Sequence, residues 1–127
     1  MPDKEIYEFA IIRIMPKIER GECINVGVIV FSKKKEYIGI KYLIDAERLT
    51  AFSKDIDLEE IKEYLQAWEL IANGDPNGGE LAALELPKRF RWLTASKSTV
   101  LQCSTVHPGR SSDPEAVLQD LFSKYVL

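Results

Sequence analysis

The segment that decides the fold is "ECINVGVIVFSKKKEYIGIKYLI", residues 22–44. It contains two runs rich in β-branched and aromatic residues, Glu22 to Ser32 and Glu36 to Ile44, with a lysine-rich turn between them. Runs of this kind joined by a short polar turn are typical of a β-hairpin. The segment therefore predicts two antiparallel strands.

An asparagine and a glycine interrupt the first of these strands. From Ile24 to Val30 every second residue is β-branched, which predicts one continuous buried face, whereas Asn25 and Gly27 lie on the other alternation. A buried asparagine side chain has to be hydrogen-bonded, and a glycine within a strand marks a bulge or the close approach of a backbone or a ligand. Two explanations are open: a bulge in which Asn25 anchors a neighbouring loop, and a recognition pocket.

The rest of the chain predicts one strand before this hairpin, and helices with one further strand after it. The run from Glu5 to Met15 is apolar on both alternations, so we expect it inside the sheet. Asp57 and Glu60 resemble a capping box at the start of a helix that ends at the turn-forming sequence "NGDPNGG". We also expect short helices at residues 45–53, 81–84 and 87–93, a strand at 98–105, a turn at 107–112 and a last helix at 113–125.

The order of these elements predicts an α+β fold. Three strands, two helices, a strand and a helix lack the βαβ alternation of a doubly wound sheet. We therefore expect an antiparallel mixed sheet of about four strands with helices packed on it, in the order β-β-β-α-α-β-α. A chain of 127 residues fits a single domain, residues 1–127, because a second core would leave each half too small to bury its surface.

Composition and charge exclude several classes of protein. The net charge is −3, so the molecule lacks the basic field that dominates nucleic-acid affinity, and we do not expect a nucleic-acid partner. No apolar run is long enough for a membrane helix and the N-terminus lacks the pattern of a signal peptide, which indicates a cytoplasmic protein without a membrane partner. Two cysteines are too few for a disulfide framework and predict free thiols.

The sequence also lacks the common catalytic signatures. It contains no glycine-rich phosphate loop, no GxSxG, no HExxH, no paired CxxC and no Rossmann fingerprint. We therefore assign no catalytic residue, cofactor or metal ligand. His107 is the only histidine, and as a general base it would need a nucleophile and an orienting carboxylate beside it. A structural role before Pro108 is the simpler interpretation.

Three segments together resemble the bacterial domain-of-unknown-function family 3037. They are "YEFAIIRIMPKIERGECINVGVIVF" at residues 7–31, "LPKRFRWLTASKSTVLQCSTVHPG" at 86–109 and "DPEAVLQDLF" at 113–122, so the resemblance covers nearly the whole chain. Its most specific features are Arg13 with Pro16, the run of Glu22 and Asn25 to Val28, the R-F-x-W-L sequence at 89–93, and the sequence from Val106 through His107 to Gly109.

The resemblance implies a partner rather than an established activity. Genes of this family often lie beside a gene for a HipA-type serine/threonine kinase. That arrangement implies a small partner or regulator of such a kinase rather than a stand-alone enzyme.

The polar residues of these motifs make up the predicted binding site. If the first, second and fourth strands are neighbours, their side chains would converge on an anionic group, such as a phosphate or a partner's carboxylate held by arginine. The predicted binding residues are Arg13, Glu22, Asn25, Gly27, Arg89, Gln102, Ser104, His107 and Arg110.

Three interpretations of function are open. The first is a protein-interaction or regulatory module that works with a HipA-type kinase. The second is a small enzyme or a nucleotide- or phosphate-binding protein that uses a polar pocket around Glu22, Asn25, Arg89 and His107. The third is a homodimer that pairs an exposed strand edge or an apolar sheet face.

Overall fold

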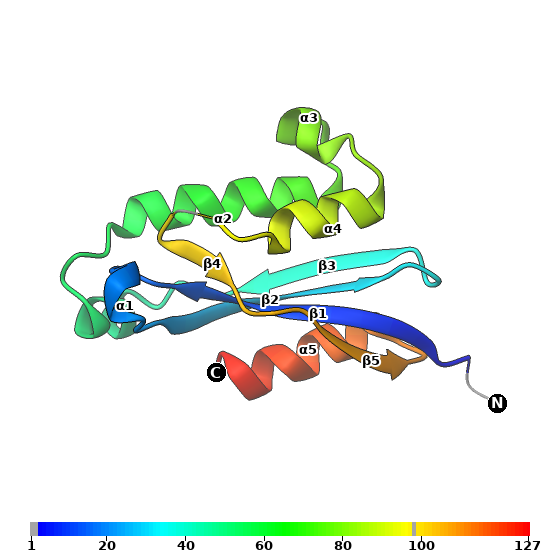
Figure 1. Cartoon of the computed structure of the whole chain (residues 1–127), viewed down its shortest axis with the longest axis horizontal. Helices are drawn as coiled ribbons and strands as arrows, with labels where there is room; N and C mark the ends of the chain where they lie inside the picture. Colours follow the sequence, from blue (N-terminus) through cyan, green and yellow to red (C-terminus); the bar gives the residue numbers. More distant parts are fainter. Residues whose placement is uncertain (1–2, 98) are drawn as a thin grey trace.

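The described residues form a five-stranded antiparallel sheet with helices on both of its faces (Figure 1). The computed structural model describes residues 3–97 and 99–127, without the side chain of Ile18. The strands are β1 (Glu5–Ile14), β2 (Ile24–Ser32), β3 (Tyr37–Tyr42), β4 (Leu101–Cys103) and β5 (His107–Ser111). The helices are α1 (Ala46–Phe52), α2 (Leu58–Asn73), α3 (Gly79–Ala82), α4 (Leu86–Thr94) and α5 (Pro114–Tyr125), with the 3-10 turns η1 (Ile18–Arg20) and η2 (Pro76–Gly78). The predicted α+β class is confirmed.

Strand β1 lies in the middle of the sheet. Its one edge pairs with β2, and β3 follows beyond β2. Its other edge is shared, because β5 pairs with residues 5–9 and β4 pairs with residues 12–14. The apolar character of both alternations of β1 follows from this position, since helices lie over both faces of the sheet. The prediction that the first strand lies inside the sheet is confirmed.

Strand β5 replaces the turn that was predicted at residues 107–112. His107 pairs with Phe9 and Ser111 pairs with Glu5, in antiparallel register. Pro108 cannot donate a ladder hydrogen bond, which is tolerated in an edge strand. The turn prediction was wrong because proline and glycine favour turns locally, whereas the long strand β1 offers this segment a free edge. The predicted fourth strand is the short β4, and its predicted start at Ser98 lies outside the described residues.

Side-chain caps begin the two longest helices as predicted. The Asp57 carboxylate accepts the N–H of Glu60 at 3.2 Å at the start of α2, which ends at Gly74 with a φ of 65°. At the start of α5, the Asp113 carboxylate accepts the N–H of Ala116 at 3.1 Å. Among the described helices, none combines the length and the apolar character that crossing a membrane takes.

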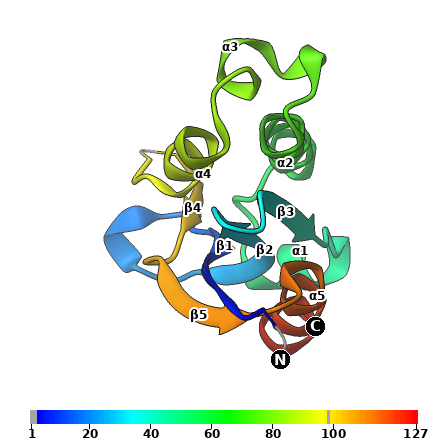
Figure 2. The ribbon, with the colours of Figure 1, turned by 90° about the vertical axis from the view of Figure 1, so that its right-hand side faces the viewer.

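The two faces of the sheet carry separate hydrophobic cores. Helices α2 and α4 pack over the face that includes Ile12 and Ile14, which we call the α2 face. Helix α5 packs over the opposite face on β2 and β3, and we call this the α5 face. Figure 2 shows the sheet end-on between these two helical layers. The candidate residues of the sequence are therefore divided between two faces and the edges of one sheet.

Candidate functional site

Strand β2 contains a β-bulge opposite the end of β1. Ile12 of β1 pairs with Gly27. The next residue of β1, Arg13, pairs with Asn25 instead of the residue directly before Gly27. Val26 is therefore an extra residue in β2, and the ladder is interrupted there.

The bulge divides the buried side chains of β2 between the two cores. Val26 packs in the core of the α2 face, whereas Val28 and Val30 pack beneath α5. The continuous buried face predicted from Ile24 to Val30 was wrong, because one extra residue exchanges the faces of the alternation. The local sequence does not distinguish Val26 in the bulge from the valines in the regular part of the strand.

Asn25 joins the bulge to the end of helix α5. Its Oδ1 accepts a hydrogen bond from Arg13 Nε at 3.3 Å, and its Nδ2 donates to the carbonyl oxygen of Tyr125 at 3.1 Å. Both polar ends of the amide side chain are thus bonded. The bulge explanation is confirmed, with the difference that Asn25 anchors a helix end rather than a loop.

Gly27 allows strand β3 to approach closely. A Cβ atom at this position would lie 2.8 Å from the carbonyl oxygen of Lys41 and 2.9 Å from Cβ of Tyr42. Real Cβ atoms do not reach such distances, so a larger residue would push the two strands apart. The glycine therefore serves backbone packing between β2 and β3.

Gln102 and Ser104 form hydrogen bonds near the point on the edge of β1 where pairing changes from β4 to β5. The Gln102 side chain donates to the carbonyl oxygens of Lys97 and Thr99 and accepts the N–H of Lys97. The Ser104 hydroxyl is buried, accepts the N–H of Ile11 at 2.8 Å and donates to the carbonyl of Thr105 at 2.9 Å. Ser104 thus takes the place of a ladder bond between the registers of β4 and β5.

Arg89 closes the C-terminal end of helix α2. Its Nη1 lies 3.0 Å from the carbonyl oxygen of Ala72 and 3.4 Å from that of Ile71. The Ile71 carbonyl also accepts the N–H of Gly74, so the guanidinium mainly satisfies the Ala72 carbonyl, and it complements the helix dipole. The guanidinium of Arg89 therefore has hydrogen-bond partners within the chain, which its position in the sequence did not reveal.

His107 and Arg110 lie on strand β5, and both are exposed. The His107 ring lies 5.4 Å from the Phe9 ring, and its Nε2 is 3.3 Å from Oγ1 of Thr105. Arg110 pairs with Ile6 at the start of β1. Neither side chain has a carboxylate partner among the ion pairs formed by the described residues.

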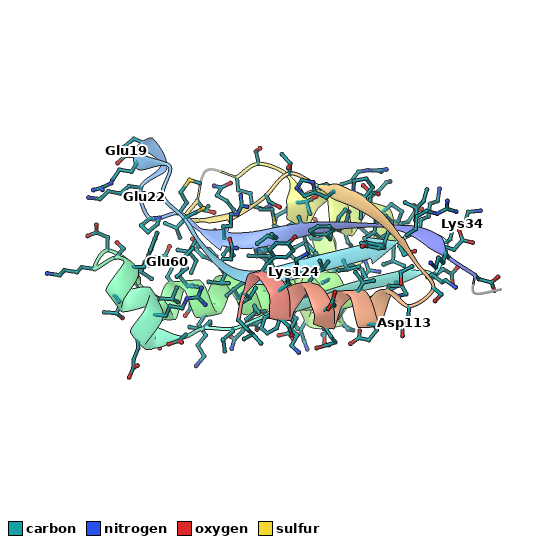
Figure 3. All side chains as sticks on the ribbon, turned by 90° about the horizontal axis from the view of Figure 1, so that it is seen from below. Glu19, Glu22, Lys34, Glu60, Asp113 and Lys124 are labelled. Carbon is teal, nitrogen blue, oxygen red and sulfur yellow. The ribbon has the colours of Figure 1, made fainter. Side chains whose placement is uncertain are left out.

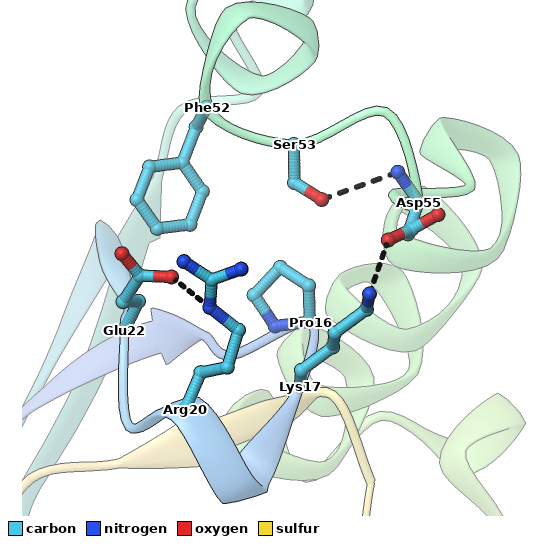
Figure 4. Close-up of a pocket in the computed structure, with 7 residues that line it drawn as sticks. All are labelled: Pro16, Lys17, Arg20, Glu22, Phe52, Ser53 and Asp55. Atoms are coloured by element: carbon cyan, nitrogen blue, oxygen red, sulfur yellow. Dashed lines mark hydrogen bonds and ion pairs between the residues drawn. The ribbon is translucent and has the colours of Figure 1, made fainter.

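Glu22 lines a small polar cavity at the other end of the sheet (Figure 4). The cavity has a volume of about 210 Å³. Arg20 Nε lies 2.7 Å from Glu22 Oε1, and Lys17 Nζ lies 3.4 Å from Asp55 Oδ2. Within each pair, the cation and the carboxylate neutralise one another. Because both pairs are exposed, they contribute little to stability. The remaining wall residues are Pro16, Phe52 and Ser53.

The structure does not bring Glu22, Arg89 and His107 together. Glu22 lies just before β2, near Ile14 of β1, whereas His107 pairs with Phe9 of the same strand. Five residues along a strand span roughly 17 Å. Arg89 lies on α4, over the α2 face. The acid–base arrangement that the small-enzyme interpretation needs is therefore absent among these described residues.

A cleft that the sequence did not predict lies between α2 and α4. It has a volume of about 470 Å³, and we call it the α2–α4 cleft. Tyr64 and Trp92 are each 36% exposed at this cleft, while Trp68 is 5% exposed. The full set of wall residues is Tyr64, Ala67, Trp68, Ile71, Trp92, Ala95, Ser96, Lys97, Thr99 and Leu101.

Lys97 lies between the two tryptophans of the cleft. Its Nζ is 5.0 Å from the Trp68 ring centroid and 4.6 Å from the Trp92 ring centroid. The same nitrogen donates to the carbonyl oxygens of Trp92, Leu93 and Ala95 at 2.6, 3.0 and 3.0 Å. Burial lowers the pKa of the Lys97 ammonium. All three of its hydrogens are used at the end of α4, so Lys97 has none left for a ligand.

Cys103 adds no nucleophile near this cleft. Its Sγ lies 3.4 Å from the carbonyl oxygen of Leu93, and burial raises the pKa of its thiol to about 12. The thiol is therefore protonated at neutral pH, and only a thiolate attacks or binds metal well. The described residues also form no group of three or more His, Cys, Asp or Glu side chains placed to hold a metal ion. The cleft offers shape and apolar surface rather than reactive groups.

One signal in the sequence points to this cleft. Tyr64 and Trp68 are four residues apart on a helix, so both lie on one side of α2, and Tyr64 extends the buried stripe toward solvent. The pairing of that side with Trp92 cannot be read from the sequence, because it depends on how α4 packs against α2.

Comparison with known proteins identifies a family for the chain. Residues 9–126 match the family model described as Protein of unknown function (DUF3037). No curated protein and no solved structure matches the chain.

Proposed function

The chain belongs to the DUF3037 family, and we propose that it acts as a protein-interaction module that binds its partner through the α2–α4 cleft. The observation that carries this proposal is the pair of exposed aromatic side chains, Tyr64 and Trp92, at the rim of an apolar hollow. Contiguous exposed apolar surface is uncommon on a soluble monomer and marks sites of association.

The composition of the cleft suits a protein partner. Tryptophan and tyrosine are the residues most enriched in the energetic centres of protein interfaces, because they bury a large area and lose few rotamers. Ala67 and Ile71 of α2 add apolar surface to the wall of the cleft. A partner side chain that enters here would displace water from apolar surface on both sides, which is favourable.

The state of the polar residues supports binding rather than catalysis. Asn25, Arg89 and Gln102 are already hydrogen-bonded to backbone groups of this chain. The arginines and the histidine of the sequence motifs do not meet at one point. A site that works by association needs no activated group, and the cleft contains none.

The resemblance noted in the sequence supports a HipA-type kinase as the partner, and we propose a regulatory role for the complex. We place both proteins in the cytoplasm, which is supported by the two free cysteines of this chain.

The test measures binding of a HipA-type kinase encoded in the same genome to the purified chain by calorimetry. We expect a saturable one-to-one complex. The variant Ala67→Arg places a long cation in the cleft and is expected to weaken binding by more than about tenfold, equivalent to about 1.4 kcal/mol. Ala67 is exposed, so this change should leave the fold intact.

The matched control is Gln66→Arg, one position earlier on α2 and also exposed. Successive helical residues point about 100° apart, so this arginine adds the same charge outside the cleft. Equal loss of binding in both variants would show a general charge effect and contradict the proposed site. Absence of any complex with either protein in excess would contradict the proposed partner.

A further inference from the structure

The α2–α4 cleft continues into a second cavity along helix α2. This second cavity has a volume of about 410 Å³ and shares Tyr64 and Thr99 with the cleft. Its other walls come from the loop after β1 and from the start of α2, including Glu19 and Glu60. The two hollows are therefore adjacent, with Tyr64 and Thr99 between them, and we treat them together as one groove with an aromatic end and a second end that we call the acidic end.

The acidic end has more negative than positive charge, with two glutamates and one lysine in its lining. Figure 3 shows Glu19 and Glu60 at the same end of the molecule. Lys17 also lines this cavity, but its ammonium pairs with Asp55 at 3.4 Å. The two ion pairs of the described residues leave both glutamates unpaired.

The Tyr64 hydroxyl, which lies between the two ends, has a pKa that this negative charge raises. The charge of Glu60, followed by a hydrogen bond to Glu60 and the charge of Glu63, raises the pKa of Tyr64. Glu63 precedes Tyr64 on α2 and lines neither cavity, so it contributes only its charge. A cation from a partner would relieve the repulsion among these carboxylates.

The aromatic end has the opposite preference. Lys97, the cation among its described wall residues, uses its three hydrogens on backbone carbonyls, and Trp68 and Trp92 flank the same ammonium. A second cation placed there would meet this buried positive charge. An apolar side chain avoids this repulsion and can pack on the exposed Trp92 side chain and the apolar surface of α2, so the aromatic end favours an uncharged anchor.

From this division we infer that the partner presents a basic, amphipathic segment to the groove. One large apolar side chain enters the aromatic end beside Trp92 and Ala67, and a lysine or arginine lies against Glu19 and Glu60. The inference rests on the proposed function of the cleft and adds the chemistry of the partner segment.

The length of the groove sets the spacing of these two side chains. Glu60 and Trp68 are separated by eight positions on α2, which correspond to roughly 12 Å. An extended segment covers that distance in about four residues, and a helical segment covers it in about eight. The basic residue and the apolar anchor should therefore recur at one of these spacings.

The test selects displayed random peptides on the full chain and removes those that also bind the Ala67→Arg variant. We expect the enriched peptides to carry a lysine or arginine and a large apolar residue at one of the two spacings. Enriched peptides without an excess of lysine and arginine would overturn the inference and leave the proposed interaction site standing. Failure to enrich any peptide that distinguishes wild type from Ala67→Arg would overturn both.

A charge variant separates the acidic end from the overall charge of the chain. For an enriched peptide, the double variant Glu19→Gln with Glu60→Gln should weaken binding by about tenfold at low salt and reduce its salt dependence. The matched control is Glu59→Gln with Glu47→Gln, two exposed glutamates that do not line the groove. The inference fails if both double variants lose the same affinity.

A second copy of the chain is the competing occupant of the groove. Light scattering of the wild type and of Ala67→Arg distinguishes it from a partner segment. We expect both proteins to have the same mass over the concentrations used for selection. Self-association that Ala67→Arg abolishes would assign the groove to a homodimer and overturn the inference.

Discussion

The Asn25 side chain at the bulge in β2 and the α2–α4 cleft lie on opposite faces of the same sheet, and their conspicuous residues are used in different ways. At the bulge, the Asn25 amide is bonded on both sides, to Arg13 and to the end of α5. At the cleft, Tyr64 and Trp92 leave apolar surface exposed that no other described residue covers. The polar residues that look unusual in a strand hold the fold together, and the exposed aromatic residues are those available to a partner.

This difference has an energetic basis. A buried polar group costs free energy unless it is bonded, so a folded chain provides it with partners of its own. An exposed aromatic side chain costs much less, so a chain can keep one free for binding. Substitutions at the bulge should therefore change stability, and substitutions at the cleft should change binding.

Gly27→Ala should have the largest effect on stability. The new Cβ would lie 2.8 Å from the Lys41 carbonyl oxygen, so β2 and β3 must separate. We expect a loss of about 1–3 kcal/mol in the free energy of unfolding, measured by urea denaturation. A loss below about 0.5 kcal/mol would show that the strands adjust freely and that close backbone approach is not what Gly27 provides.

Asn25→Ala should follow, with a loss of about 1–2 kcal/mol. The change leaves the Tyr125 carbonyl and the Arg13 guanidinium without their present partner. Asn73→Ala, an exposed asparagine at the end of α2, is the control and should change stability by less than about 0.5 kcal/mol. Unchanged stability of Asn25→Ala together with lost partner binding would contradict the assignment of Asn25 to the fold.

The stability of the protein at alkaline pH should depend on the hydrogen-bonded hydroxyl of Tyr42, which packs against the core of the α2 face. Burial, with help from the hydrogen bond to Glu69, raises the pKa of Tyr42 from about 10 to about 12. Because the folded state holds this proton more tightly than the unfolded state, the contribution is present below about pH 10 and is lost as the pH rises toward 12.

Tyr42→Phe should therefore flatten the fall in the urea midpoint between pH 10 and 12. Burial also raises the pKa of Tyr37, assisted by its hydrogen bond to Glu115, so part of the alkaline slope should persist in this variant. An identical slope in wild type and Tyr42→Phe would contradict the role of the Tyr42 hydroxyl.

Tyr64→Ala should have the smallest effect on stability and a large effect on binding. Tyr64 is exposed at the rim of the cleft, so we expect a change of less than about 0.5 kcal/mol in unfolding and a loss of more than about tenfold in partner affinity. Tyr125→Ala is the control, because Tyr125 is equally exposed, at 36%, but lies on α5 away from the cleft. Equal affinity of both variants for the partner would remove the distinction between the two regions.

Local sequence was sufficient for most of the secondary structure. Asp57, Gly74 and Asp113 mark helix ends through bonds or φ values that involve residues a few positions away. The hairpin of β2 and β3 and the interior position of β1 follow from short apolar patterns. Such features can be predicted because their causes lie within one or two turns of chain.

The tertiary structure alone decided the parts that depend on distant partners. The bulge at Val26 exists because β2 pairs with β1, and β5 is a strand because β1 has a free edge. Arg89 reaches the end of α2 because α4, which carries it, packs beside α2. The cleft likewise needs Trp68 and Trp92, which belong to different helices. The sequence by itself determined most of the strands and helices, with β5 as the exception, because those preferences are local. Their contacts were decided by the packing of the whole chain, because each contact depends on surfaces that many distant residues form together.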